Sequence, residues 1–340
     1  MALSRIKTWI AEVLTYADLN AEFDNILNNA NSLISPFTTS VNAGGFKITN
    51  YGSTDAPTAT TDVALNAFVQ SGTSPTTRTI QNKDRDQPVD LADFLPDSYV
   101  TDGSVDYATQ IARALSASAG RGLRFPAGGG TYQSSTAQTL PANTSLDLRG
   151  AILKFTPAGA VECLLLRSGC AVINGTVQNA GSVPSGGGNN QCPILIGDAG
   201  VGTGYTDIVV DRVTLINNRA DGLGILVTGA STNIIIRNIT GSGDSTTGAL
   251  VAVEWGGQTT PTAGTFHPQN VIIENINAGT YSRAVSSIVY LSGAVNCSIR
   301  NVHADGCITG VTVYCGDYGV YYASAAIKAL GFGGISVSNV

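Results

Sequence analysis

Carboxylates and aromatic side chains occur together in two C-terminal stretches of this 340-residue chain, one near residue 250 and one near residue 317. The candidate catalytic carboxyls are Glu254, Asp244 and Asp317, and the candidate substrate-binding aromatics are Trp255, Tyr314, Tyr318 and Tyr321. Aromatic rings pack on the flat apolar faces of sugars. Two carboxyl groups cleave a glycosidic bond when they lie about 5–5.5 Å apart for retention or about 6.5–9.5 Å apart for inversion. These residue types therefore indicate carbohydrate chemistry, and the sequence leaves the pairing of the carboxyls open.

The surroundings of Glu254 can be interpreted from strand alternation. In residues 250–255 (LVAVEW), Val251, Val253 and Trp255 fall on one face and Glu254 on the other. If the valines point inward, Trp255 belongs to the core and Glu254 faces outward. His267 and His303 are expected in loops or on the surface rather than as general bases.

Metal chemistry has little support in the sequence. The six cysteines include no Cys-x-x-Cys pair, and only two histidines accompany them, so we predict no metal site and no cofactor. Cys297 falls at an inward position of the repeat described next, where a small buried thiol is expected.

A short phrase recurs seven times and predicts the fold. It reads apolar, any, apolar, polar, Asn/Gly/Arg, small or apolar, and its copies follow one another after about 26 and about 37 residues, alternately. The copies are residues 146–151, 171–176, 208–213, 234–239, 271–276, 297–302 and 335–340. Alternating apolar residues indicate strands. One strand per short period, among 40 glycines, predicts a right-handed parallel β-helix over residues 121–340. Leucine-rich repeats would need a Leu lattice, and propellers need longer periods.

Two columns of the repeat are expected to be structural. The position before the Asn/Gly/Arg site reads Arg149, Asn174, Asp211, Arg237, Glu274, Arg300 and Ser338. The charges alternate in sign from Asp211 to Arg300, which stabilises neighbouring strands. The next position predicts an asparagine ladder of Asn238, Asn275, Asn301 and Asn339. Every second interval is longer, so insertions are expected in 178–205, 241–268 and 303–332, where loops often carry function.

Composition narrows the function classes. A net charge of −6 and a pI near 4.8 provide no basic field, so we expect no nucleic-acid partner. No apolar run is long enough to predict membrane insertion, and residues 1–10 lack an apolar signal-peptide core. Synthesis and folding in a cytoplasm are expected.

The N-terminal third of the sequence lacks the repeated phrase and shows other patterns. Apolar residues at coiled-coil spacing predict a helix over 15–34, which ends at Ser35-Pro36. We expect an attachment region over 1–80 and a linker with a capping helix over 81–120. In that helix Ala108, Ile111 and Leu115 share one face.

Two N-terminal segments resemble bacteriophage tail proteins. Residues 14–23 (LTYADLNAEF) resemble the opening of many phage tail proteins, and residues 43–69 resemble a unit near the virion-anchoring end of tail fibres and tailspikes. Residues 93–132, with Asp102-Gly103 and the FPAG of 125–128, are similar to the opening segment of pectate-lyase-like phage spikes. Leu95-Pro96 replaces the usual Gly-Ala there.

The resemblance implies a homotrimeric tailspike or tail fibre, made in the bacterial cytoplasm and carried on the virion. It would attach to portal-, adaptor- or nozzle-type tail proteins through residues 1–80. Its role would be adsorption to host surface polysaccharide, with depolymerase activity, as glycoside hydrolase or lyase, a further hypothesis. The alternatives are an autonomous bacterial polysaccharide lyase or glycoside hydrolase and a non-enzymatic adaptor fibre. Because the seventh copy ends at Val340, we also expect the β-helix to be incomplete at its C-terminus.

Overall fold

The computed structural model divides the chain into two compact units, Met1–Arg85 and Asp86–Val340. The residues it describes are 20–21, 41–43, 46–48, 67–68, 78–79, 87–159, 161–181, 192–198, 203–217, 223–242, 248–254, 267–278, 287–303, 309–314 and 334–340.

The first unit contributes two short antiparallel pairs to the described residues. Strand β1 (Val41–Ala43) pairs with β2 (Phe46–Ile48), and β3 (Ala67–Phe68) pairs with β4 (Arg78–Thr79). Of the helix predicted over 15–34, Asn20 and Ala21 are helical, and its other residues lie outside the described part of the chain.

The second unit begins with a cap. It consists of β5 (Val89–Asp90), the 3-10 helix η1 (Leu91–Phe94), β6 (Asp102–Asp106) and the helix α4 (Ala108–Ala117). The predicted apolar face of this helix is confirmed, because Ala108, Ile111 and Leu115 are buried together with Ala114. Helix α4 contacts β5 within the cap, and β8 (Thr131–Ser134) and β9 (Gln138–Leu140) of the first coil. A helix there covers strand edges that would otherwise be exposed.

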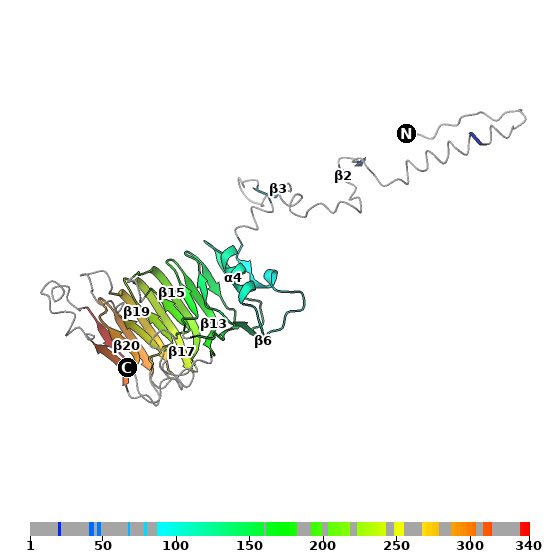
Figure 1. The fold of residues 1–340 in the computed structure, drawn as a ribbon. Helices are drawn as coiled ribbons and strands as arrows, with labels where there is room; N and C mark the ends of the chain where they lie inside the picture. The colour runs from blue at the N-terminus through cyan, green and yellow to red at the C-terminus, as the bar shows by residue number, and fades with distance from the viewer. Residues whose placement is uncertain are drawn as a thin grey trace, which may run out of the picture. The chain divides into compact units, whose positions relative to one another are not determined.

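Two parallel sheets follow, and successive coils of the chain contribute strands to both of them (Figure 1). The strands of the twelve-stranded sheet, besides β5 and β6 of the cap, are β7 (Gly122–Arg124), β8, β10 (Ser145–Asp147), β11 (Ile152–Phe155), β13 (Ala171–Asn179), β15 (Thr206–Asn217), β17 (Thr232–Ser242), β19 (Gln269–Asn277), β21 (Ser298–His303) and β23 (Ser336–Ser338). The seven-stranded sheet comprises β9, β12 (Leu164–Leu166), β14 (Ile194–Ile196), β16 (Ile225–Val227), β18 (Val251–Glu254), β20 (Ser287–Ser292) and β22 (Thr309–Tyr314). From β13 to β22 successive strands alternate between the two sheets, whereas each of the two coils before β13 contributes two strands to the twelve-stranded sheet. The predicted parallel β-helix is confirmed.

The core runs between the two sheets as stacked apolar columns. One column passes from Leu146 through Val172, Val210 and Ile236 to Ile273, all at most 1% exposed. Every coil repeats the same inward positions, so each coil buries its apolar face against its neighbours. The four cysteines in the described residues, Cys163, Cys170, Cys192 and Cys297, are buried, as expected for Cys297.

The bend in each long strand explains the asparagine column. Arg212, Asn238, Asn275, Asn301 and Asn339 all have positive φ, between 52° and 57°. Asparagine adopts this left-handed conformation more readily than most residues. The chain therefore turns at the same place in successive coils.

The predicted register of the first two copies is wrong. Asn174 has a φ of 61°, and the residues on either side of it pair with Asp211 and Val213, so Asn174 stands in line with Arg212 rather than with Asp211. Asp147 pairs with Ile173 in the column of Asp211, and Arg149 lies beyond it at the turn. The error arose because Asn174-Gly175 and Arg149-Gly150 imitate the end of the phrase one or two residues late.

Candidate site on the outer wall of the seven-stranded sheet

Glu254 stands at the end of β18 on the outer side of the seven-stranded sheet. Its backbone pairs with Ser292 of β20, which in turn pairs with Tyr314 of β22. The sheet therefore aligns two of the predicted site residues, Glu254 and Tyr314, on strands two coils apart. The side chain of Glu254 is half-buried, and Ser292 is 4% exposed.

An apolar column lies beside Glu254 on the same outer face. It comprises Leu165, Leu195, Leu226, Ala252 and Tyr290, which pair in register from β12 to β20. These side chains form a second cluster, separate from the main core, with Cys192, Leu223 and Ala249. The outer face of this sheet therefore carries a small second hydrophobic core. The residues just before β14, β16 and β18, namely Cys192, Leu223 and Ala249, complete it.

Tyr290 is an aromatic of this wall that the sequence analysis missed. It pairs with Ala252, and Glu254 is the diagonal neighbour two residues on, a separation of about 7–8 Å that aromatic side chains can span. The sequence signal was present, because Tyr290 alternates with the inward Val289 and Leu291.

The alternation expected around Glu254 holds in the described residues. Val251 and Val253 are fully buried in the main core, and Glu254 faces the other side. Among the described strands of this sheet, Glu254 is the only carboxylate. Any second carboxyl at the wall would come from a loop. The remaining predicted site residues, Asp244, Trp255, Asp317, Tyr318 and Tyr321, lie outside the described part of the chain.

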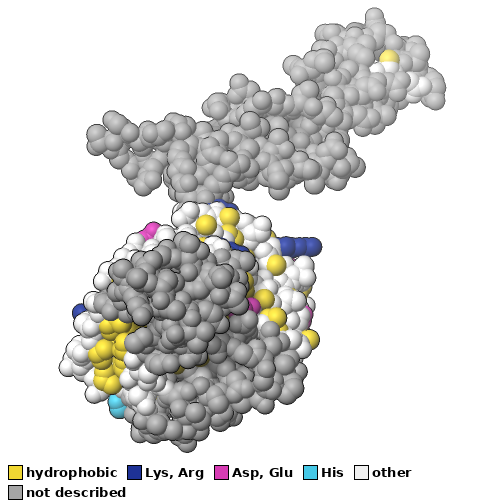
Figure 2. Space-filling view, turned by 60° about the vertical axis from the view of Figure 1, so that its left-hand side comes forward, with side chains coloured by type: hydrophobic (Ala, Val, Ile, Leu, Met, Phe, Trp, Pro, Cys, Tyr) yellow, Lys and Arg dark blue, Asp and Glu magenta, His cyan; other side chains and the backbone are white. Residues whose placement is uncertain are grey.

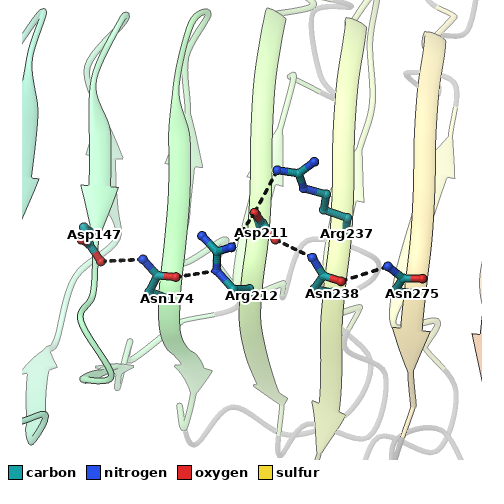
Figure 3. A network of polar contacts seen from close by, with 7 residues as sticks. All are labelled: Asp147, Asn174, Asp211, Arg212, Arg237, Asn238 and Asn275. Carbon is teal, nitrogen blue, oxygen red and sulfur yellow. Dashed lines mark hydrogen bonds and ion pairs between the residues drawn. The ribbon is translucent and has the colours of Figure 1, made fainter.

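Asp147 and Asp211 of the twelve-stranded sheet belong to polar ladders between coils (Figure 3). Arg237 Nη2 donates to Asp211 Oδ2 at 3.1 Å, and Asn238 Nδ2 donates to Asp211 Oδ1 at 2.8 Å. Burial acts to raise the pKa of Asp211, but the bonds from Asn238 and Arg237 outweigh it and lower the pKa below the ordinary 3.8. Arg300 of β21 binds Glu274 of β19 in the same way, in the next ion pair along the sheet. The structural role predicted for Asp211 and Glu274 agrees with this geometry.

The amide column continues the same network. Asn275 Nδ2 donates to Asn238 Oδ1 at 3.0 Å, Asn301 to Asn275 at 2.9 Å, and Asn339 to Asn301 at 3.0 Å. A second column, which the sequence analysis missed, runs along the start of the strands, where Asn233 donates to Asp207 and Asn270 donates to Asn233. Its members also have positive φ, so it fixes the entry into each strand.

His267 is not a surface residue. It is 3% exposed, and its Nδ1 lies 2.9 Å from the Gly293 carbonyl oxygen of the next coil. Burial lowers the pKa of His267, which keeps the ring neutral. His267 lies in the segment just before β19, so the expectation of a loop or surface position holds for its location in a loop but not for the surface, whereas His303 is exposed.

One open groove of about 510 Å³ lies along helix α4. Its lining includes Asp106, Arg113 and Ser135. The Asp106 carboxylate accepts hydrogen bonds from the backbone N–H groups of Ala108 and Ser135 and from the Ser135 hydroxyl. Asp106 thus joins the start of the helix to the turn between β8 and β9.

One face of the coil unit carries a hydrophobic patch, and the basic side chains on it are scattered (Figure 2). The most exposed large hydrophobic residues in the described part are Val340 at 62%, Val313 at 49% and Val337 at 45%. No described helix is long and apolar enough to cross a membrane.

No family model and no curated protein matches this chain. Among solved structures, a mutant tailspike protein of E. coli bacteriophage HK620 in complex with a hexasaccharide is 14% identical with a TM-score of 0.44, covering 74% of this chain and 54% of that chain. The tailspike of the same phage in complex with a pentasaccharide is 15% identical with a TM-score of 0.42, covering 74% and 53%. The chain spans about half the length of these proteins, and identity this low transfers no residue role.

Proposed function

We propose that the chain is a subunit of a bacteriophage tailspike or tail fibre that binds host surface polysaccharide. The observation that carries the proposal is the cap. The segment that resembles the opening of phage spikes folds as η1, β6 and α4 against the first coil of a parallel β-helix. In this proposal, residues 1–80 attach the subunit to tail proteins of the virion, and residues 121–340 form the receptor-binding coils. Synthesis takes place in the host cytoplasm.

The outer wall of the seven-stranded sheet is the proposed glycan site. It combines a half-buried carboxylate at Glu254, a hydroxyl at Ser292 and the aromatic ring of Tyr290 beside an apolar column. A depolymerase would use Glu254 with one carboxyl from Asp244 or Asp317, and Trp255, Tyr314, Tyr318 and Tyr321 would complete the sugar contacts.

A homotrimer is the proposed assembly. The outer face of the twelve-stranded sheet carries an apolar column of Val209, Ile235 and Ile272, in which Ile272 is 36% exposed. Exposed apolar columns of this kind suit association between subunits. Light scattering of the purified chain should therefore give three times the subunit mass of 34.9 kDa. A monomer that still blocks virion adsorption would contradict the trimer and leave the receptor role standing.

Replacing Glu254 by glutamine separates a cleaving spike from a binding fibre. If Glu254 is a general acid or base, release of new reducing ends from host polysaccharide should fall by about 10²–10⁴-fold, since proton transfer contributes this much. Binding of the same glycan should persist because glutamine keeps the shape of the side chain.

Glu274→Gln is the matched control, because Glu274 lies on the other sheet in an ion pair with Arg300. It should leave release unchanged. Unsaturated uronate absorbance that accompanies the new reducing ends would identify a lyase, and reducing ends without it would identify a hydrolase. Adsorption blocked by purified protein without any release would identify a binding fibre. If the wild-type protein neither binds glycan nor blocks adsorption, the adaptor-fibre alternative replaces the receptor role.

A further inference from the structure

Tyr132 lies where the cap meets the first coil. It belongs to β8, which pairs with β6 of the cap on one side and with β11 of the coil on the other. The side chain is completely buried. Its ring packs edge-on against Phe125 with ring centroids 5.1 Å apart, and the ring of Tyr99 lies at 6.4 Å. The residue therefore sits deep in the main core.

The hydroxyl of Tyr132 is a polar atom in this apolar setting. It is buried, and none of the described residues forms a hydrogen bond with it. The hydroxyl of Tyr107 in the same core behaves differently, because it accepts the Val100 N–H at 2.8 Å and donates to the Val100 carbonyl at 3.1 Å. Buried hydroxyls in proteins nearly always have a partner, and an unpaired one costs the free energy of a lost hydrogen bond.

Asp90 of the cap lies near Tyr132, because it pairs with Arg124, and the ring of the next residue, Phe125, packs on the Tyr132 ring. Burial, together with Tyr99, Asp90 and Tyr107, raises the pKa of Tyr132 to about 12. Asp90 Oδ1 accepts the Ala92 N–H at 3.0 Å as the N-cap of η1. An ionised carboxylate has two oxygens with about four lone-pair sites, so Asp90 retains acceptor capacity.

We propose that one internal water molecule occupies this junction, accepts the O–H of Tyr132 and donates a hydrogen bond to the Asp90 carboxylate. Buried waters typically make about three hydrogen bonds to polar groups that otherwise lack partners. The bridge joins the strand β8 to the first residues of the cap. It adds a polar link to the packing of Leu91, the residue of η1 that is buried in the main core. The bridge is independent of the receptor role proposed above.

Tyr132→Phe tests this bridge through the sign of its effect. If a water satisfies the hydroxyl, its removal breaks a real hydrogen bond, and Tm should fall by about 2–4 °C for a domain of this size. Tyr107→Phe is the positive control, since both of its hydrogen bonds go to the protein, and it should lower Tm by a similar amount. Asp90→Asn keeps a capping side chain, and in that background Tyr132→Phe should have a smaller effect.

The opposite outcome would overturn the inference. If the hydroxyl is dry and unpaired, Tyr132→Phe removes only a desolvated polar group, and Tm stays the same or rises. A crystal structure that resolves ordered waters gives a direct answer. A water within hydrogen-bond distance of Tyr132 Oη and the Asp90 carboxylate supports the bridge. A direct Tyr132–Asp90 hydrogen bond, or an empty site, refutes it.

Discussion

Gly197→Ala should abolish the native β-helix or reduce its stability by more than about 4 kcal/mol, among the largest effects expected for a single substitution. Gly197 follows β14 with a φ of +106°, and a Cβ there would lie 2.0 Å from the Thr228 carbonyl oxygen of the next coil. Backbone atoms cannot move aside as a flexible side chain can. The two coils would have to separate, and circular dichroism during urea unfolding would record the loss.

Gly128→Ala is the matched control. Gly128 has a φ of +101°, but a Cβ there would meet no atom within 4 Å. Its cost should be limited to the backbone strain of an L-residue in that region, about 1–3 kcal/mol. Equal effects at Gly128 and Gly197 would mean that conformational strain, and not the approach of neighbouring coils, sets the requirement for glycine.

Asp211→Asn should reduce the free energy of unfolding by about 3 kcal/mol, the lower end of the range for a broken buried pair. The carboxylate is only 4% exposed and binds Arg237 and Asn238, but the Arg237 side chain is 42% exposed, so water partly compensates for the loss. Urea unfolding of both proteins at pH 7 measures the difference.

The pH dependence of this difference has a definite sign. Because the pKa of folded Asp211 lies below 3.8, its contribution is complete above that value and disappears as the pH falls through the folded pKa. The gap between wild type and variant should therefore narrow in acid. Glu274→Gln, in a more exposed pair, should cost only about 0–1 kcal/mol. A loss at Glu274 as large as at Asp211 would show that burial does not decide the strength of these ladders.

The fold was predictable because the β-helix repeats one set of local constraints. The sequence Ile234-Ile235-Ile236-Arg237-Asn238 already contains the inward apolar pair, the charged position and the left-handed turn that the structure shows. The alignment of the first two copies with the later ones was harder to predict, because glycine follows the polar residue at the turn in both. Asn174 precedes a glycine, and both residues suit a turn, so the pattern alone could not choose between them.

The candidate site was only partly predictable, for a different reason. Glu254 could be placed facing outward because strand alternation fixes the face. The position of Tyr290 beside Glu254 could not be predicted, because the two residues lie on different coils and their proximity depends on the register of β18 with β20. His267 is near an insertion in the sequence, yet it is buried, and its hydrogen-bond partner Gly293 is far along the chain and adjacent in space.

The placement of the amide columns also bears on how such a surface can change. Asn233 and Asn238 both belong to β17, and each donates a hydrogen bond to an aspartate of the preceding coil. Bonds between the strands therefore hold the spacing of the coils. The connections that leave the seven-stranded sheet take no part in these bonds, at least where the chain is described. Segments of different length and sequence can then be exchanged between β18 and β19 without changing the scaffold, so in the proposed receptor role ligand preference is separable from the fold.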